Sequence, residues 1–278
     1  MLQHNISPYI IRIWGDFGIR WYSLAYIIGF IALYYFYTWL AKKGKIKNLT
    51  PNLVDRLIIV LVIGIILGAR FFHTFVFEPG YYLSHPADIL KIWHGGLSFH
   101  GGLIGGILAG LLFSRKYKVR LLALADGSAI IIGLFLGLGR IANYINGELY
   151  GKITDVSWCI DYSKSQYIQN APEGCRHPSQ IYEAIYSFFI AGVQYFLFRK
   201  DEKRKTRRFG TGFYFYLFIT LYGILRFLTT FTRDEPGIFG TGIAEAQWFS
   251  LFMFIIGSIL LIRQGFFSSG SSRTQSRP

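Results

Sequence analysis

Seven long apolar stretches dominate the chain, and polar residues gather in the segments between them. The stretches cover residues 22–40, 57–75, 97–113, 121–141, 179–198, 212–229 and 244–262. A helix needs about 20 apolar residues to cross the hydrocarbon core of a bilayer. The pattern therefore predicts an all-α, polytopic integral membrane protein with seven transmembrane helices.

Lys and Arg are distributed unequally between the two sides of these helices. Eighteen of the 29 fall in segments on one side, and seven fall on the other. Because basic loops stay in the cytoplasm, we predict that the N-terminus is outside and the C-terminus is cytoplasmic. The first 20 residues lack the apolar core and cleavage site of a signal peptide, so the first helix is expected to be retained.

The helices define one expected domain and two segments outside the bilayer. We expect residues 1–265 to form a seven-helix transmembrane domain that carries the chemistry, with an outer loop at residues 142–178. Residues 266–278 are rich in Ser and Arg, which predicts a disordered cytoplasmic tail. The outer loop holds Cys159 and Cys175 on the side where disulfides form. We favour a disulfide that staples this loop, and two free thiols are the alternative.

The composition agrees with a membrane location and narrows the class of partner. Hydrophobic residues make up 52% of the chain and charged residues 16%, below the quarter that is typical of soluble domains. The net charge of +14 could also indicate nucleic acid. No RNA-binding motif is present, so the basic loops are expected to contact anionic lipid headgroups. The expected partner is the membrane, without nucleic acid.

Several polar residues fall at the same depth in different predicted helices. A charge within a transmembrane helix costs about 3 kcal/mol on insertion scales, so such residues are rarely accidental. Their common depth predicts one polar cavity that faces the outer leaflet. The residues are Tyr22, Arg70, His100, Arg140, His177, Glu183 and Arg226.

The third stretch combines glycines with a histidine. Gly102, Gly106 and Gly110 recur every four residues, which predicts close packing against another helix. A single histidine in an apolar segment is usually structural, but the arginines at the same depth favour a functional role for His100.

Residues 139–151 read GRIANYINGELYG and are the strongest local signal. If the helix continues past Arg140, Asn143 and Tyr144 lie on its face and Gly147 ends it with a left-handed cap. A cation, two amides and the carboxylate of Glu148 then meet at the outer mouth of the cavity. This composition favours a lipid headgroup site over a simple helix end.

This segment resembles the signature of the bacterial prolipoprotein diacylglyceryl transferase family. Three other blocks resemble that family in the same order: SFHGGLIGG at 98–106, RHPSQIYE at 176–183 and LYGILRF at 221–227. The resemblance implies transfer of diacylglyceryl from phosphatidylglycerol to the lipobox cysteine thiol of a prolipoprotein, with release of glycerol 1-phosphate. It implies the bacterial inner, or only, plasma membrane and no cofactor.

The resemblance also implies roles for individual residues. His100, Arg140 and Arg226 match catalytic positions. The positions expected to bind phosphatidylglycerol are Tyr22, Arg140, Asn143, Glu148, Gly151, Tyr222 and Arg226. The chain has Thr230 where the family pattern has an acidic residue four positions after the arginine, so Asp234, Glu235 or Glu148 would have to supply that charge.

The same residues suit the chemistry without reference to the family. A thiol must lose its proton to attack an sp³ glycerol carbon, and a neutral imidazole such as that of His100 is matched to that task near pH 7. Guanidinium groups such as those of Arg140 and Arg226 stabilise a phosphate leaving group with two donors at once. No His or Cys pair has the spacing of a metal site.

Two other classes of function remain as alternatives. An anion transporter would line a pore with Arg70, Arg140 and Arg226, and it would distribute basic residues through the full depth of the bilayer. A non-catalytic protein of the membrane would bind lipid without transferring any part of it. Gain of a diacylglyceryl mass on a lipobox peptide separates both from the transferase.

Overall fold

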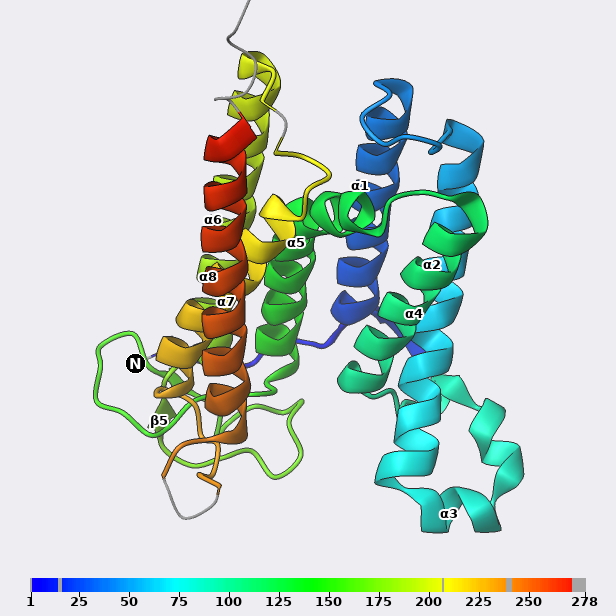
Figure 1. Ribbon diagram of the computed structural model, residues 1–278. Coiled ribbons are helices and arrows are strands. Elements are labelled where there is room, and N and C mark those ends of the chain that lie inside the picture. Colours follow the sequence, from blue (N-terminus) through cyan, green and yellow to red (C-terminus); the bar gives the residue numbers. More distant parts are fainter. Residues whose placement is uncertain (1, 15–16, 207, 239–241, 272–278) are drawn as a thin grey trace, which may run out of the picture. The chain divides into compact units, whose positions relative to one another are not determined.

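The computed structural model describes residues 2–14, 17–206, 208–238 and 242–271 of the chain. It is mostly helical, as Figure 1 shows. The long helices are α1 (Trp21–Lys42), α2 (Pro51–Phe72), α4 (Phe99–Tyr117), α5 (Leu121–Asn146), α6 (Ser179–Arg204), α7 (Phe213–Thr230) and α8 (Glu245–Ser271). Between α2 and α4 lie the short helices η1 (His73–Phe77), α3 (Pro79–Ser84), η2 (Pro86–Leu90) and η3 (Ile92–His94).

Six helices among the described residues are long and apolar enough to cross a membrane. They are Trp21–Lys42, Pro51–Phe77, Leu121–Asn146, Ser179–Arg204, Phe213–Thr230 and Glu245–Gly265. The chain is therefore a multi-pass membrane protein. The third predicted span is helical as α4 but is not one of the six, because glycines, His100 and a polar end lower its hydropathy.

Short strands accompany the helices of this mostly helical chain, a detail that the all-α prediction leaves out. β2 (Tyr9–Trp14) and β3 (Phe17–Arg20) form an antiparallel hairpin directly before α1. β1 (Leu2–Gln3) pairs in parallel with β4 (Ile160–Asp161), which pairs with β5 (Cys175–Arg176). β2 is rich in isoleucine, which favours strands. A search for apolar stretches of about 20 residues does not detect such short elements.

The described helices belong to two compact units. The first contains Met1–Ala32 and Asp126–Pro278, and the second contains Leu33–Ala125. Helices α1 and α5 each contribute to both units. The prediction of one domain over residues 1–265 is not tested by this division.

Helix α8 runs to Ser271, six residues into the predicted disordered tail, and residues 272–278 lie outside the described part of the chain.

In the second unit, α2 and α4 pack through facing glycines. A Cβ on Gly101 would overlap the carbonyl of Gly68, and a Cβ on Gly105 would overlap that of Gly64. A Cβ on Gly110 would meet nothing within 4 Å. Gly102 and Gly106 also face α2, where a Cβ would lie 3.5 and 3.2 Å from Ile65. The predicted packing stripe is therefore confirmed for Gly102 and Gly106 but not for Gly110, and the closest contacts belong to Gly101 and Gly105.

Arg70 fixes the short helices of the second unit to the end of α2. Its guanidinium donates to the carbonyl oxygens of Ile89 at 2.8 Å, of Gly95 and Gly96 at 2.9 Å each, and of Asp88 at 2.5 Å. It also lies 4.9 Å from the centre of the Tyr82 ring. Arg70 is buried. These contacts give Arg70 a structural role.

In the first unit, α6, α7 and α8 run side by side (Figure 1). Gly223 of α7 allows close approach to α8, since a Cβ there would lie 2.7 Å from the backbone of Ser250 and Phe254. Buried Asp126 of α5 accepts hydrogen bonds from the N–H groups of Gly210, Gly212 and Phe215 at 2.8 to 3.0 Å. A carboxylate here satisfies N–H groups at the N-terminus of α7.

The loop at residues 142–178 is held by a disulfide and by the N-terminal segment. Cys159 and Cys175 are bonded with their Cα atoms 5.5 Å apart, so the favoured prediction is confirmed. His4 is only 1% exposed, and its Nε2 donates to the carbonyl of Tyr144 at 2.8 Å. Its ring lies between those of Tyr144 and Tyr162, with centroids 5.5 and 5.1 Å away. Burial lowers the pKa of His4 below its ordinary value.

Candidate functional site

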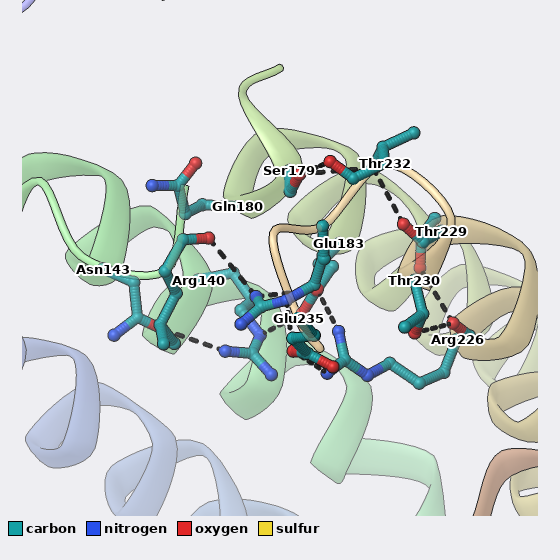
Figure 2. A network of polar contacts seen from close by, with 12 residues as sticks. Arg140, Asn143, Ser179, Gln180, Glu183, Arg226, Thr229, Thr230, Thr232 and Glu235 are labelled. Carbon is teal, nitrogen blue, oxygen red and sulfur yellow. Dashed lines mark hydrogen bonds and ion pairs between the residues drawn. The ribbon is translucent and has the colours of Figure 1, made fainter. Parts of the chain in front are cut away.

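Glu183 is the centre of a polar cluster in the first unit. It lies on the second turn of α6 and its side chain is fully buried. Figure 2 shows it between the guanidinium groups of Arg140, from α5, and Arg226, from α7. The two helices on either side of α6 in the sequence thus bring their charges to its carboxylate, and a buried carboxylate of this kind has to be paired.

The ion pairs to Glu183 use both of its oxygens. Nε of Arg140 lies 2.6 Å from Oε2, an ion pair without an aligned hydrogen bond. Nη1 of Arg226 donates to Oε1. Nη1 of Arg233, from the segment after α7, lies 3.2 Å from the same atom.

Glu235 is the second carboxylate of the cluster. Its Oε1 lies 3.2 Å from Nη2 of Arg226 and 2.5 Å from Nε of Arg233. The hydroxyl of Thr230 donates to the carbonyl oxygen of Arg226 at 2.7 Å instead of carrying a charge. The acidic partner that Thr230 lacks is therefore supplied by Glu183 and Glu235. Three arginines and two glutamates leave the cluster with one excess positive charge.

The end of α5 has the predicted geometry. The helix continues to Asn146, and Gly147 has the left-handed φ of 69° that the sequence pattern requires. Nη1 of Arg140 donates to Oδ1 of Asn143 at 3.2 Å. Asn143 in turn donates to Oε2 of Glu148 at 3.1 Å, and Asn146 donates to Oε1 at the same distance. Glu148 thus orients the amide that contacts Arg140.

Gly151 is required for packing at this site. A Cβ there would overlap the hydroxyl of Ser179 and the carbonyl of Thr232, and would lie 2.7 Å from Cβ of His177. The backbone N–H of Gly151 donates to the carbonyl of His177 at 2.9 Å. This close approach joins the loop at residues 142–178 to the start of α6 and the end of α7, which accounts for glycine without a lipid contact.

The two tyrosines of the predicted site belong to the first unit. The Tyr22 ring lies 5.3 Å from that of Tyr26, which packs edge-on against Phe135 of α5 at 4.9 Å. Tyr222 is one turn before Arg226 on α7, and its ring lies 5.8 Å from that of Tyr186 on α6. Both are partly exposed. Their lipid contacts stay predictions.

His100 and Arg70 belong to the second unit. His100 lies in the first turn of α4, where it is exposed and its ring packs edge-on against Phe99 with centroids 5.8 Å apart. Its action on a substrate held by Arg140 stays a prediction. The donors of Arg70 are occupied by carbonyl groups, so it offers little to an anion pore.

Two site residues were not identified as binding residues from the sequence. In the sequence, Arg233 contributes only to the count of basic residues that predicts the orientation in the membrane, although it lies seven residues after Arg226. Glu183 was placed in the polar cavity without a role. His177 contacts the Tyr182 hydroxyl through Nδ1 at 3.2 Å. No three His, Cys, Asp or Glu side chains in the described chain are grouped closely enough to hold a metal ion.

The cluster is suited to bind a phosphate. Arg140 is 21% exposed, and Nη2 of its guanidinium has no hydrogen-bond partner within the described residues. Planar guanidinium groups that a buried carboxylate holds in place present fixed donors to an oxyanion. The excess positive charge favours an anionic ligand over a neutral one.

Comparisons with known proteins agree with this chemistry. Residues 8–263 match the sequence profile of the family described as prolipoprotein diacylglyceryl transferase. The chain is 38% identical to the phosphatidylglycerol–prolipoprotein diacylglyceryl transferase of Bordetella avium over 94% of this chain and 96% of that protein. It is 39% identical to that of Geobacter sulfurreducens (93% and 95% covered) and 40% identical to that of Rickettsia canadensis (94% and 98% covered).

Proposed function

The chain belongs to the prolipoprotein diacylglyceryl transferase family, and from that premise we propose how it performs the reaction. It transfers the diacylglyceryl group of phosphatidylglycerol to the lipobox cysteine thiol of a prolipoprotein. A thioether forms and glycerol 1-phosphate leaves. The observation that carries the assignment of the site is the group of three arginines held by buried Glu183.

The proposed arrangement in the membrane includes α4 as a seventh span. Its glycine contacts with α2, which is one of the six apolar helices, support a place beside it in the bilayer. The N-terminus then lies outside and the C-terminus lies in the cytoplasm, in the inner or only plasma membrane of a bacterium. The disulfide in the loop at 142–178 supports the outer location of that loop.

Each step of the reaction has a candidate residue. His100 accepts the thiol proton. The thiolate sulfur attacks the carbon of the diacylglyceryl group that carries the phosphate ester. The carbon–oxygen bond breaks, and its electron pair stays on the phosphate. Arg140 and Arg226 stabilise that charge, and a donor placed in this way typically contributes about 100-fold or more in rate. The reaction needs no redox group.

The remaining residues position the lipid and the arginines. Asn143 and Glu148 hold the guanidinium of Arg140 through the hydrogen bonds described above. Tyr22 lies at the start of α1, and Tyr222 lies near the middle of α7, one turn before Arg226. We assign both to the glycerol and acyl parts of phosphatidylglycerol. Gly151 contributes close packing.

A transfer assay with purified components tests the proposal. The protein in detergent is mixed with phosphatidylglycerol and a lipobox peptide, and mass spectrometry follows the peptide. The expected result is the gain of one diacylglyceryl mass with equimolar release of glycerol phosphate. A peptide in which serine replaces the cysteine is the matched control and stays unmodified. Absence of any gain under conditions where the protein remains folded contradicts the proposal.

A further inference from the structure

A polar cavity of about 390 Å³ lies in the first unit, beside the cluster of Glu183 but separate from it. The β2–β3 hairpin, the end of α5 and the outer loop at residues 166–169 form its walls. The volume is within the range of ligand-binding clefts. None of the roles assigned above uses this cavity.

One wall carries two arginines on an aromatic support. Arg12 and Arg20 both lie over the ring of Tyr9, at 5.5 and 4.8 Å from its centre. Arg20 also donates to the Tyr9 hydroxyl at 2.8 Å. Among the described residues of the lining, Glu148 is the one carboxylate that faces these two cations. The described part of this wall is therefore moderately cationic.

Another part of the lining carries carboxamide groups. Asn146, Gln166 and Gln169 line the cavity, and the latter two are exposed. The side chains of Gln166 and Gln169 make no hydrogen bond within the described part of the chain. A carboxamide offers both a donor and an acceptor, which is the pattern of a peptide bond. Such a wall fits an extended polypeptide better than it fits acyl chains.

The cavity connects to the phosphate-binding cluster through two hydrogen bonds. Glu148 lines the cavity and accepts from Asn143, and Asn143 accepts from Arg140. Helix α1 begins at Trp21 and α5 ends at Asn146, so the cavity lies where two membrane-spanning helices end. In the proposed orientation these are the outer ends, where a secreted polypeptide leaves the bilayer.

We propose that this cavity binds the residues of the acceptor polypeptide that follow the lipobox cysteine. The inference rests on the proposed function, because it assumes that a cysteine-containing polypeptide is the acceptor. A segment held beside Glu148 places the preceding cysteine next to the arginines, since only a few residues of extended chain separate the two sites. The cavity thereby distinguishes the polypeptide from water and from other thiols as acceptors.

The test combines a change in the protein with a change in the peptide. The variant carries Gln166→Ala and Gln169→Ala, and Lys164→Ala in the same loop is the control because Lys164 is exposed and does not line the cavity. One lipobox peptide extends several residues past the cysteine, and the other ends at the cysteine as an amide. KM and kcat are measured for both peptides and for phosphatidylglycerol.

The expected result is a rise of about tenfold in KM for the long peptide in the variant, the loss that follows removal of two neutral hydrogen bonds to a substrate. KM for the short peptide, KM for phosphatidylglycerol and kcat stay unchanged. Equal effects on both peptides indicate a merely structural change and overturn the inference. A rise in KM for phosphatidylglycerol assigns the cavity to the lipid and overturns it as well.

A binding measurement separates this inference from the proposed function. Fluorescence anisotropy of a labelled long peptide is recorded with the wild-type protein, the double variant and the Lys164→Ala control, without phosphatidylglycerol. Weaker binding by the double variant alone supports the inference even if no transfer is found. Equal binding by all three proteins, or no binding by the wild type, overturns it even if transfer is found.

Discussion

Replacement of Glu183 by glutamine tests whether the charged cluster is built around this carboxylate. The substitution keeps the volume of the side chain and removes one negative charge. Arg140, Arg226 and Arg233 then face each other with Glu235 as their remaining charged partner in the cluster. The positive charges of these arginines then repel one another strongly, because the site is buried.

The structure gives the size of the expected effect. Glu183 is fully buried, and removal of one partner from a buried ion pair costs about 3–5 kcal/mol. Glu235→Gln should cost less, because the side chain of Glu235 is 25% exposed and solvent screens its pairs. Activity should fall with stability, because the arginines lose their fixed orientation.

Thermal unfolding in detergent and the transfer assay measure the two effects. Glu202→Gln on the same helix is the matched control, since Glu202 lies 3.9 Å from Arg199 near the other end of α6, away from the cluster. We expect a lower Tm and a loss of transfer for Glu183→Gln and neither effect for Glu202→Gln. Wild-type stability of Glu183→Gln would refute the idea that this carboxylate holds the arginines.

Three further predictions concern single residues. His100→Gln should slow transfer and recover in part at higher pH, because a thiol loses its proton without a base as pH rises; a loss that does not change with pH points to packing. Burial lowers the pKa of His4 from 6.5, so docking of β1 should be complete above about pH 6.5 and weaken as pH falls through the lowered pKa. Hydrogen exchange at the His4 N–H measures this, and His4→Gln should abolish the pH dependence; an equal dependence in that variant is the contrary result. Gly105→Ala should destabilise the protein by about 1–3 kcal/mol in thermal unfolding, whereas Gly110→Ala should be neutral, and equal effects would contradict the observed packing of α2 on α4.

The sequence predicted the membrane helices well because hydropathy over about 20 residues is a strong signal. It predicted the end of α5 equally well, since Gly147 and the amides before it define a local motif. The β2–β3 hairpin and the two glycines of α4 that make the closest contacts with α2 were not predicted. Hairpin strands are too short for the hydropathy search, and the choice between Gly101 and Gly102 depends on the facing helix.

The site could be predicted only in part. Arg140 and Arg226 stand out because a charge in an apolar helix is costly. Arg233 follows the end of α7 in a polar segment, where a charge is ordinary and carries no signal. The pairing of all three with Glu183 depends on how α5, α6 and α7 pack, and that arrangement cannot be read from local pattern.

The most direct test of the central claim is the single-turnover rate of transfer by arginine variants at saturating lipid and peptide. The account predicts that Arg140→Ala and Arg226→Ala insert normally but lose about 100-fold or more in rate, because each lacks a donor to the leaving phosphate. Lysine at either position should restore little, since an ammonium lacks the planar pair of donors. Near-normal transfer by Arg140→Ala or Arg226→Ala would contradict the claim that this cluster binds the phosphate.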